Sequence, residues 1–210
     1  MFQSAQCVLS MPPPPEAPVT ILAALVEGDT SIVLAADSYE ERFNPELRIY
    51  LWEPVDKFQC RKFGNAFLAW GYAGSGAGDS FSENIGSLSM GTWEEFQEGV
   101  RGNVRAINEP LWPDLNKTVD LVVAGYINGE QRVIGVTPWG DLHQPVGNAL
   151  FVGRGGPEVG VPIWTDLLTR GGSETPAALK KTLDSFVDRV TGLKGPIRRW
   201  RLTPNDFQEI

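Results

Sequence analysis

The chain has 210 residues, of which 42% are hydrophobic and 21% are charged, and this composition is typical of one large globular domain or two small ones. Its net charge of −8 argues against nucleic acid or an anionic membrane as the main partner, and no apolar run approaches the roughly 18 residues that span a bilayer. Two cysteines, Cys7 and Cys60, provide neither a disulfide framework nor a metal-ligand spacing, so we expect a cytoplasmic protein that requires no metal or cofactor.

The first 18 residues contain four consecutive prolines and favour an extended arm with little packing. Their apolar stretch is too short for a signal peptide and lacks the basic start of one. Met11 is an alternative start of the chain. We expect residues 1–18 to form a flexible Pro-rich arm and residues 19–210 to form a single domain.

Strands dominate the first half of that domain. Apolar or extended runs predict them at residues 19–26, 31–36, 48–63 (interrupted by Pro54) and 65–74. The turn signal EGDT joins the first two runs into a hairpin, which ends on the acid Asp37. The first clear helix start follows at Thr92, because Thr92 and Glu95 form a capping-box pattern.

The second half begins with a hairpin at residues 119–141, whose tip is the strong turn signal Asn128-Gly129. The single histidine, His143, follows in the turn-like sequence GDLHQP, where we expect it to be solvated. The remaining predicted elements are a strand at 148–153, helices at 156–168 and 175–190 (capped by Thr175) and a closing strand at 196–202. Consecutive hairpins without βαβ alternation predict an α+β fold with two mostly antiparallel sheets, each covered by helices.

Several sequence pieces occur in the order in which they appear in proteasome β subunits and their bacterial HslV relatives, and the chain resembles this family over about residues 19–202. The pieces are VTILAALVEGDTSIVLAADS, VDKFQC, AWGYAGSGAGDS and LFVGRGGPEVGVPIWTDLL. The resemblance implies a four-layer αββα sandwich, the fold of the N-terminal-nucleophile (Ntn) hydrolases. This fold agrees with the order of elements derived above.

The resemblance also implies a site around an N-terminal threonine. Asp37 matches the family acid at the end of the second strand, and Lys57 matches the lysine that this acid faces. A threonine hydroxyl needs a base, and a free α-amine with a pKa near 8 can serve as one. Gly74 in YAGSG matches the glycine whose N–H helps to hold the oxyanion. Asp188 and Thr191 in DRVTG resemble the family's Asp-x-x-Ser-Gly.

Two positions depart from the family pattern. Alignment of the first strand puts Val19 at the nucleophile position and Thr20 at the next one, although a longer hairpin before Asp37 leaves a shift of one residue open. Arg154 in GRGG stands where the family peptidases have serine, and a guanidinium cannot relay protons. An N-terminal nucleophile also needs a free amine, which requires removal of the preceding arm.

These departures favour a non-catalytic, proteasome-type subunit that forms a ring with copies of itself or with related subunits. One alternative is an active threonine-type endopeptidase that acts on peptides or unfolded protein, with Thr20 as the nucleophile after loss of the arm. A second alternative is a binding module that holds an anionic ligand near Arg154 and Lys57. The sequence leaves these three hypotheses open.

Overall fold

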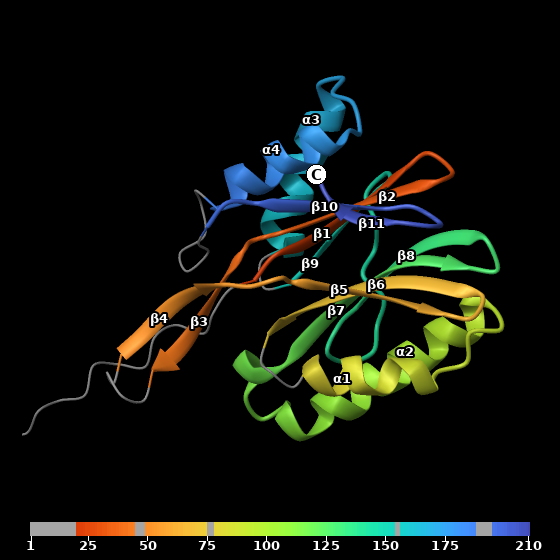
Figure 1. Ribbon diagram of the computed structural model, residues 1–210. Coiled ribbons are helices and arrows are strands. Elements are labelled where there is room, and N and C mark those ends of the chain that lie inside the picture. Colours follow the sequence, from red (N-terminus) through yellow and green to blue (C-terminus); the bar gives the residue numbers. More distant parts are fainter. Residues whose placement is uncertain (1–19, 45–48, 75–77, 154–155, 188–194) are drawn as a thin grey trace, which may run out of the picture.

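The computed structural model describes residues 20–44, 49–74, 78–153, 156–187 and 195–210. Two antiparallel sheets lie face to face in the middle of the molecule, with one pair of helices above them and another pair below (Figure 1). The expected α+β fold of four layers, αββα, is confirmed. The predictions for the N-terminal arm, Arg154, Asp188 and Thr191 concern positions outside the described residues.

The first sheet joins strands from the two ends of the chain. Its order is β11-β10-β2-β1-β9, and the strands are β1 (Leu22–Glu27), β2 (Ser31–Ala36), β9 (Ala149–Val152), β10 (Arg198–Leu202) and β11 (Phe207–Glu209). β2 pairs with β1 on one side and with β10 on the other, with Ala36 opposite both Leu22 and Arg198. The centre of this sheet therefore forms from segments that are far apart in sequence.

The second sheet is built from neighbouring segments. Its order follows the chain, with β5 (Phe58–Phe63), β6 (Ala66–Gly74), β7 (Val119–Ile127) and β8 (Glu130–Val136). The hairpin of β7 and β8 turns at Asn128 and Gly129, both with positive φ, as the sequence predicts. A separate two-stranded hairpin, β3 (Tyr39–Asn44) and β4 (Ile49–Pro54), projects from the body of the molecule (Figure 1).

Helices cover the outer face of each sheet. They are α1 (Gly78–Asn84) and α2 (Trp93–Asn108) on the second sheet, and α3 (Val161–Thr169) and α4 (Pro176–Val187) on the first (Figure 1). Short helical turns are η1 (Ile85–Ser87), η2 (Glu109–Leu111), η3 (Leu115–Lys117) and the π-helical η4 (Gly156–Gly160). None of the helices in the described parts of the chain is long and apolar enough to cross a membrane.

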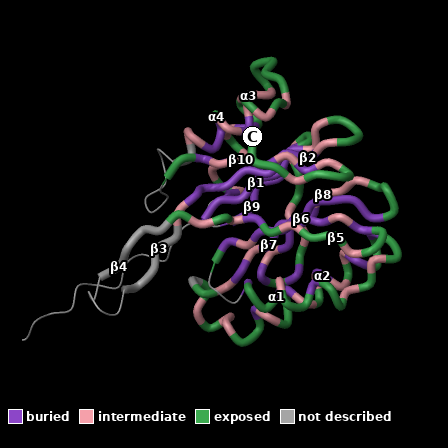
Figure 2. The backbone as a smooth tube through the Cα atoms, viewed as in Figure 1, coloured by how far each residue is buried: buried purple, intermediate pink, exposed green. Residues whose placement is uncertain are grey.

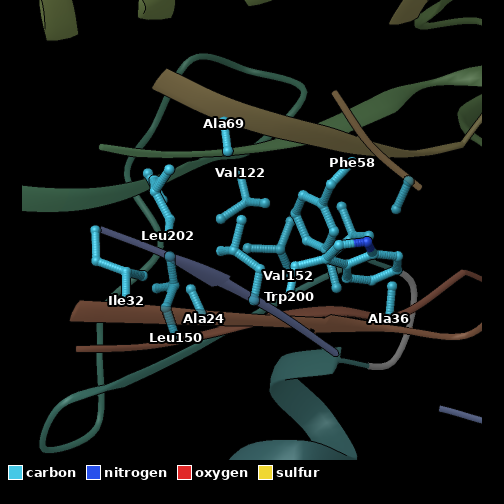
Figure 3. Close-up of a cluster of buried hydrophobic side chains, with 14 of the residues drawn as sticks. Ala24, Ile32, Ala36, Phe58, Ala69, Val122, Leu150, Val152, Trp200 and Leu202 are labelled. Carbon is cyan, nitrogen blue, oxygen red and sulfur yellow. The ribbon is translucent and has the colours of Figure 1, made fainter. Parts of the chain in front are cut away.

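The interior consists of three apolar layers. The middle layer lies between the two sheets, where Phe58 and Trp200 meet edge to face with ring centroids 5.3 Å apart (Figure 3). The outer layers lie between each sheet and its helices, around Trp93 and Phe96 on one side and Trp164 on the other. In Figure 2 the central strands β1, β7 and β9 are coloured mostly as buried, whereas exposed residues gather along the helices and loops outside the sheets. Both faces of each sheet are therefore covered, which explains why central strands such as β1, β2 and β7 are almost continuously apolar.

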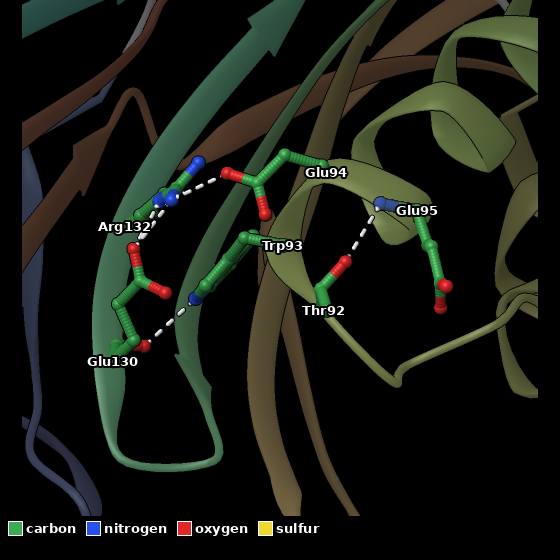
Figure 4. A network of polar contacts seen from close by, with 6 residues as sticks. All are labelled: Thr92, Trp93, Glu94, Glu95, Glu130 and Arg132. Atoms are coloured by element: carbon green, nitrogen blue, oxygen red, sulfur yellow. Dashed lines mark hydrogen bonds and ion pairs between the residues drawn. The ribbon is translucent and has the colours of Figure 1, made fainter.

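The cap of α2 is as the sequence predicts. Thr92 Oγ1 accepts a hydrogen bond of 3.2 Å from the Glu95 backbone N–H (Figure 4). The next residue, Trp93, donates from its indole to the Glu130 carbonyl at 2.7 Å, and Arg132 forms ion pairs with Glu94 and Glu130. This network fastens the start of the helix to the β7–β8 hairpin.

Asn108 provides a further polar link inside the core. Its amide donates to the Val104 and Val119 carbonyls at 2.9 and 3.0 Å, and its oxygen accepts from the Val119 N–H at 2.6 Å. We expect Asn108→Leu to lower the free energy of unfolding by about 2 kcal/mol, because the buried backbone groups of Val119 lose their partner. Urea unfolding of the two proteins measures this difference. An unchanged transition midpoint would show that these hydrogen bonds contribute nothing to stability.

Some elements differ from the sequence predictions. The helix expected from Gly156 begins as the π-helical turn η4 and becomes α-helical at Val161, where a proline at the second position suits a helix start. The sequence did not indicate α1, because its first residues lie in a run of small residues that resembles a loop. The short strands β3 and β11 were missed as well.

Candidate functional site

Three strand ends bring Thr20, Asp37 and Lys57 together. Thr20 lies just before β1, Asp37 directly after β2 and Lys57 directly before β5. Lys57 Nζ donates to Thr20 Oγ1 at 3.3 Å and lies 3.9 Å from Asp37 Oδ2, while Asp37 Oδ1 accepts from the Ile21 N–H at 3.0 Å. The prediction of a close Asp37–Lys57 pair beneath the start of the first strand is confirmed.

Asp37 is almost completely buried, with 1% of its side chain exposed. Burial raises the pKa of this carboxyl group from its ordinary 3.8 to about 6, against the opposing effects of the Lys57 cation and of the hydrogen bond from Ile21. The carboxylate is thus ionised near neutral pH and loses its charge in mild acid. Its attraction for Lys57 therefore weakens as the pH falls through about 6.

The threonine hydroxyl that contacts Lys57 belongs to Thr20. The alignment that put Val19 at this position concerns a residue outside the described ones. In the turn after β1, Glu27 pairs with Ser31 across three intervening residues. Since Thr20 precedes the first paired residue, Leu22, strand alternation does not direct its side chain. Thr20 is thus the residue whose hydroxyl faces the Asp37–Lys57 pair.

Gly74, the predicted oxyanion residue, lies at the end of β6 and lines the same cavities as Thr20. Its φ of +130° is rarely adopted by other residues, and a Cβ atom built here would lie 2.1 Å from the Thr118 carbonyl oxygen. Glycine is therefore required at this position by the close approach of β7. The structure brings Thr20, Asp37, Lys57 and Gly74 together, whereas Asp188 and Thr191 lie outside the described residues.

Two cavities meet at Thr20 and Gly74. The first has a volume of about 230 Å³ and extends past Lys57 toward Asp56 and Asp79. Both of these carboxylates already have partners, because Asp56 forms an ion pair with Arg198 and Asp79 accepts a 2.6 Å hydrogen bond from the Tyr72 hydroxyl. The second cavity has a volume of about 480 Å³. A chain-like ligand that crosses Thr20 would therefore find space on either side.

The second cavity contains the one histidine of the chain, for which the sequence predicted no role. His143 lines it together with Asp120, and His143 Nε2 lies 3.0 Å from Asp120 Oδ1. The imidazole is only 13% exposed, so His143 is not a solvated turn residue as expected. The pair joins the loop after β8 to the start of β7. A turn-like sequence gave no signal for it, because the partner lies 23 residues away on another element.

No family model matches the chain, and no curated protein matches it. Solved structures do match. Anbu, an ancestral beta-subunit, from Yersinia bercovieri is 15% identical, with a TM-score of 0.65 over 91% of this chain and 86% of that one. Eukaryotic HslV from Trypanosoma brucei is 16% identical, with a TM-score of 0.59 over 87% of this chain and 99% of that one.

A third match is the helical assembly of the Anbu complex from Pseudomonas aeruginosa, which is 15% identical with a TM-score of 0.66 over 91% of this chain and 86% of that one. At such identities the likeness concerns the fold, and it agrees with the layers and the sheet order described above. The chain therefore has the four-layer, proteasome-like fold of the N-terminal-nucleophile hydrolases.

Proposed function

We propose that the protein is a threonine-type amide hydrolase with Thr20 as its nucleophile, active on peptides once the bond before Thr20 has been cut. The observation that carries this proposal is the 3.3 Å contact between Lys57 Nζ and Thr20 Oγ1, next to the buried Asp37. A hydroxyl, a cation and a carboxylate in this order at the meeting point of two cavities suit nucleophilic catalysis. An ordinary ion pair at a strand end has no need of the hydroxyl.

The chemistry requires a free amine at Thr20. In that form the neutral α-amine accepts the proton of Oγ1, which attacks the carbonyl carbon of the scissile amide. The acyl group passes to Oγ1, and the proton leaves with the departing amine. Water then hydrolyses the ester and restores the hydroxyl. The positive charge of Lys57 favours the oxyanion and the neutral amine, and the Gly74 N–H is our candidate for the oxyanion donor.

The arm before Thr20 is the regulatory part of this proposal. While residue 19 is bonded to Thr20, the nitrogen is an amide and cannot act as a base. A subunit that keeps its arm is therefore a non-catalytic member of an assembly, the role that the departures from the family pattern favour. The Anbu complex from Pseudomonas aeruginosa forms a helical assembly, and by analogy we propose that this chain associates with copies of itself.

The intact mass of the purified protein tests the proposal. We expect a mass that lacks residues 1–19, and an N-terminal sequence that begins with Thr20-Ile21-Leu22. The Thr20→Ala protein is the matched control and should keep the whole arm if Thr20 itself performs the cut. The proposal fails if the wild-type chain keeps its arm and a chain released at Thr20 by an added protease does not hydrolyse peptide amides.

A further inference from the structure

The second cavity has the chemistry of a site for a cation. Its polar side chains include the His143–Asp120 pair and the exposed Glu158. Trp139 and Leu115 add large apolar surfaces, with 51% and 58% of each residue exposed. None of the described residues that line the cavity is Lys or Arg. The first cavity differs, because it contains the cation Lys57.

The His143–Asp120 contact defines what the imidazole can offer a ligand. A carboxylate only accepts hydrogen bonds, so the hydrogen of the neutral ring lies on Nε2, which faces Asp120 Oδ1 at 3.0 Å. Nδ1 then carries a lone pair and accepts a hydrogen bond. The second carboxylate oxygen of Asp120 and the carboxylate of Glu158 are further acceptors. A ligand that donates several hydrogen bonds and carries positive charge matches this set.

We propose that the second cavity binds the cationic side chain of a substrate residue, arginine or lysine, next to the bond that Thr20 attacks. This inference rests on the proposed function for its substrate, and on the cavity alone for its charge preference. The guanidinium or ammonium group donates to the carboxylates of Asp120 and Glu158. The aliphatic stem packs on Leu115 and Trp139, and the indole face adds a cation–π contact.

Binding is measured on a chain that begins at residue 20 and carries Thr20→Ala, so that neither the arm nor turnover interferes. The probes are two acetylated tripeptide amides, Ala-Arg-Ala and Ala-citrulline-Ala, because citrulline has nearly the shape of arginine without its charge. His143 is the single histidine of the chain, so its imidazole resonances in an NMR spectrum report on this cavity without ambiguity. We expect the arginine peptide to shift these resonances and to bind roughly tenfold more tightly than the citrulline peptide.

Substitutions in the second cavity show which side chains contribute to the binding of the arginine peptide. Glu158→Gln should weaken binding of the arginine peptide roughly tenfold and leave the citrulline peptide unaffected, because one charge-assisted hydrogen bond is lost. Asp120→Asn should act in the same direction. Asp29→Asn removes the same charge from the turn between β1 and β2, at the end of these strands away from Thr20, and should change neither affinity.

Equal binding of the two peptides overturns the inference, and so does a weakening by Asp29→Asn that equals that by Glu158→Gln. Tighter binding of the glutamate peptide Ala-Glu-Ala also overturns it and favours an anion site, the alternative that Arg154 suggests. The test is separate from that of the proposed function. If the protein binds the arginine peptide selectively but wild-type protein hydrolyses nothing, the cation site is supported and the proposed function is not. If the protein hydrolyses peptides without charge preference, the proposed function is supported and the cation site is not.

Discussion

A chain that begins at Thr20 is expected to hydrolyse small peptide amides about 10²–10⁴-fold faster than a chain whose arm is still bonded to Thr20. The factor is that of general base catalysis, because cutting the bond before Thr20 turns an amide nitrogen into a free amine beside Oγ1. Initial rates with a chromogenic peptide amide measure it. Equal rates for the two forms would show that the amine takes no part.

Substitutions at Thr20 and Lys57 separate the groups involved. In the shortened chain, Thr20→Ser keeps both the hydroxyl and the amine and should retain measurable activity, whereas Thr20→Ala should have none. Lys57→Met should also be inactive, because nucleophile, base and cation act as a unit and their contributions are not additive. Substantial hydrolysis by the Thr20→Ala chain would move the nucleophile elsewhere and remove the proposed function.

Lys57→Met is also expected to destabilise the fold by about 2–4 kcal/mol at pH 8, since it leaves the Asp37 carboxylate buried without its cation. The loss should be much smaller at pH 5, where the carboxyl group of the variant is protonated. Urea unfolding at both pH values measures the difference. The double variant with Asp37→Asn should recover most of the lost stability, because a neutral pair needs no compensation.

The sign of this pH dependence follows from the raised pKa of Asp37. In the folded wild type the carboxyl group takes up its proton near pH 6, and in the unfolded chain near 3.8. Its contribution to stability is therefore fully present below about pH 4 and is lost as the pH rises through about 6. Removal of Lys57 raises the folded pKa further, so the variant should continue to lose stability above pH 6. A deficit that is equal at pH 5 and pH 8 contradicts this account.

The fold could be predicted from the sequence because its signals are local. Apolar runs buried on both faces marked the strands, and Asn128-Gly129 and Thr92 marked a turn and a helix start through their own backbone chemistry. The helix α1 could not be predicted, since small residues around Gly78 resemble a loop. Glycine is needed at position 78 because the Tyr72 ring packs against its backbone: a Cβ atom there would lie 2.2 Å from the ring.

Only part of the site could be predicted, because only part of it is marked by local sequence signals. Asp37 was found because an acid at the end of an apolar strand is conspicuous, and the family resemblance supplied Lys57 and Gly74. The alignment put Val19 at the family's nucleophile position and left a shift of one residue open, because sequence patterns fix the register of a strand poorly; the hydroxyl that contacts Lys57 is that of Thr20. His143 was expected to be solvated, since nothing near it in sequence indicates Asp120. Contacts between distant strands become visible only when the sheets are in place.

The order of strands in the first sheet has a consequence for how the protein is made. On the ribosome, β5 to β8 emerge in succession and can pair at once, whereas β2 must wait for β10, with Ile32 opposite Leu202. Thr20 precedes a strand of the late sheet, and Lys57 precedes a strand of the early one. If self-cleavage before Thr20 requires both neighbours of β2 to be in place, it follows the synthesis of the last strands, and loss of the arm then marks a chain that has finished folding.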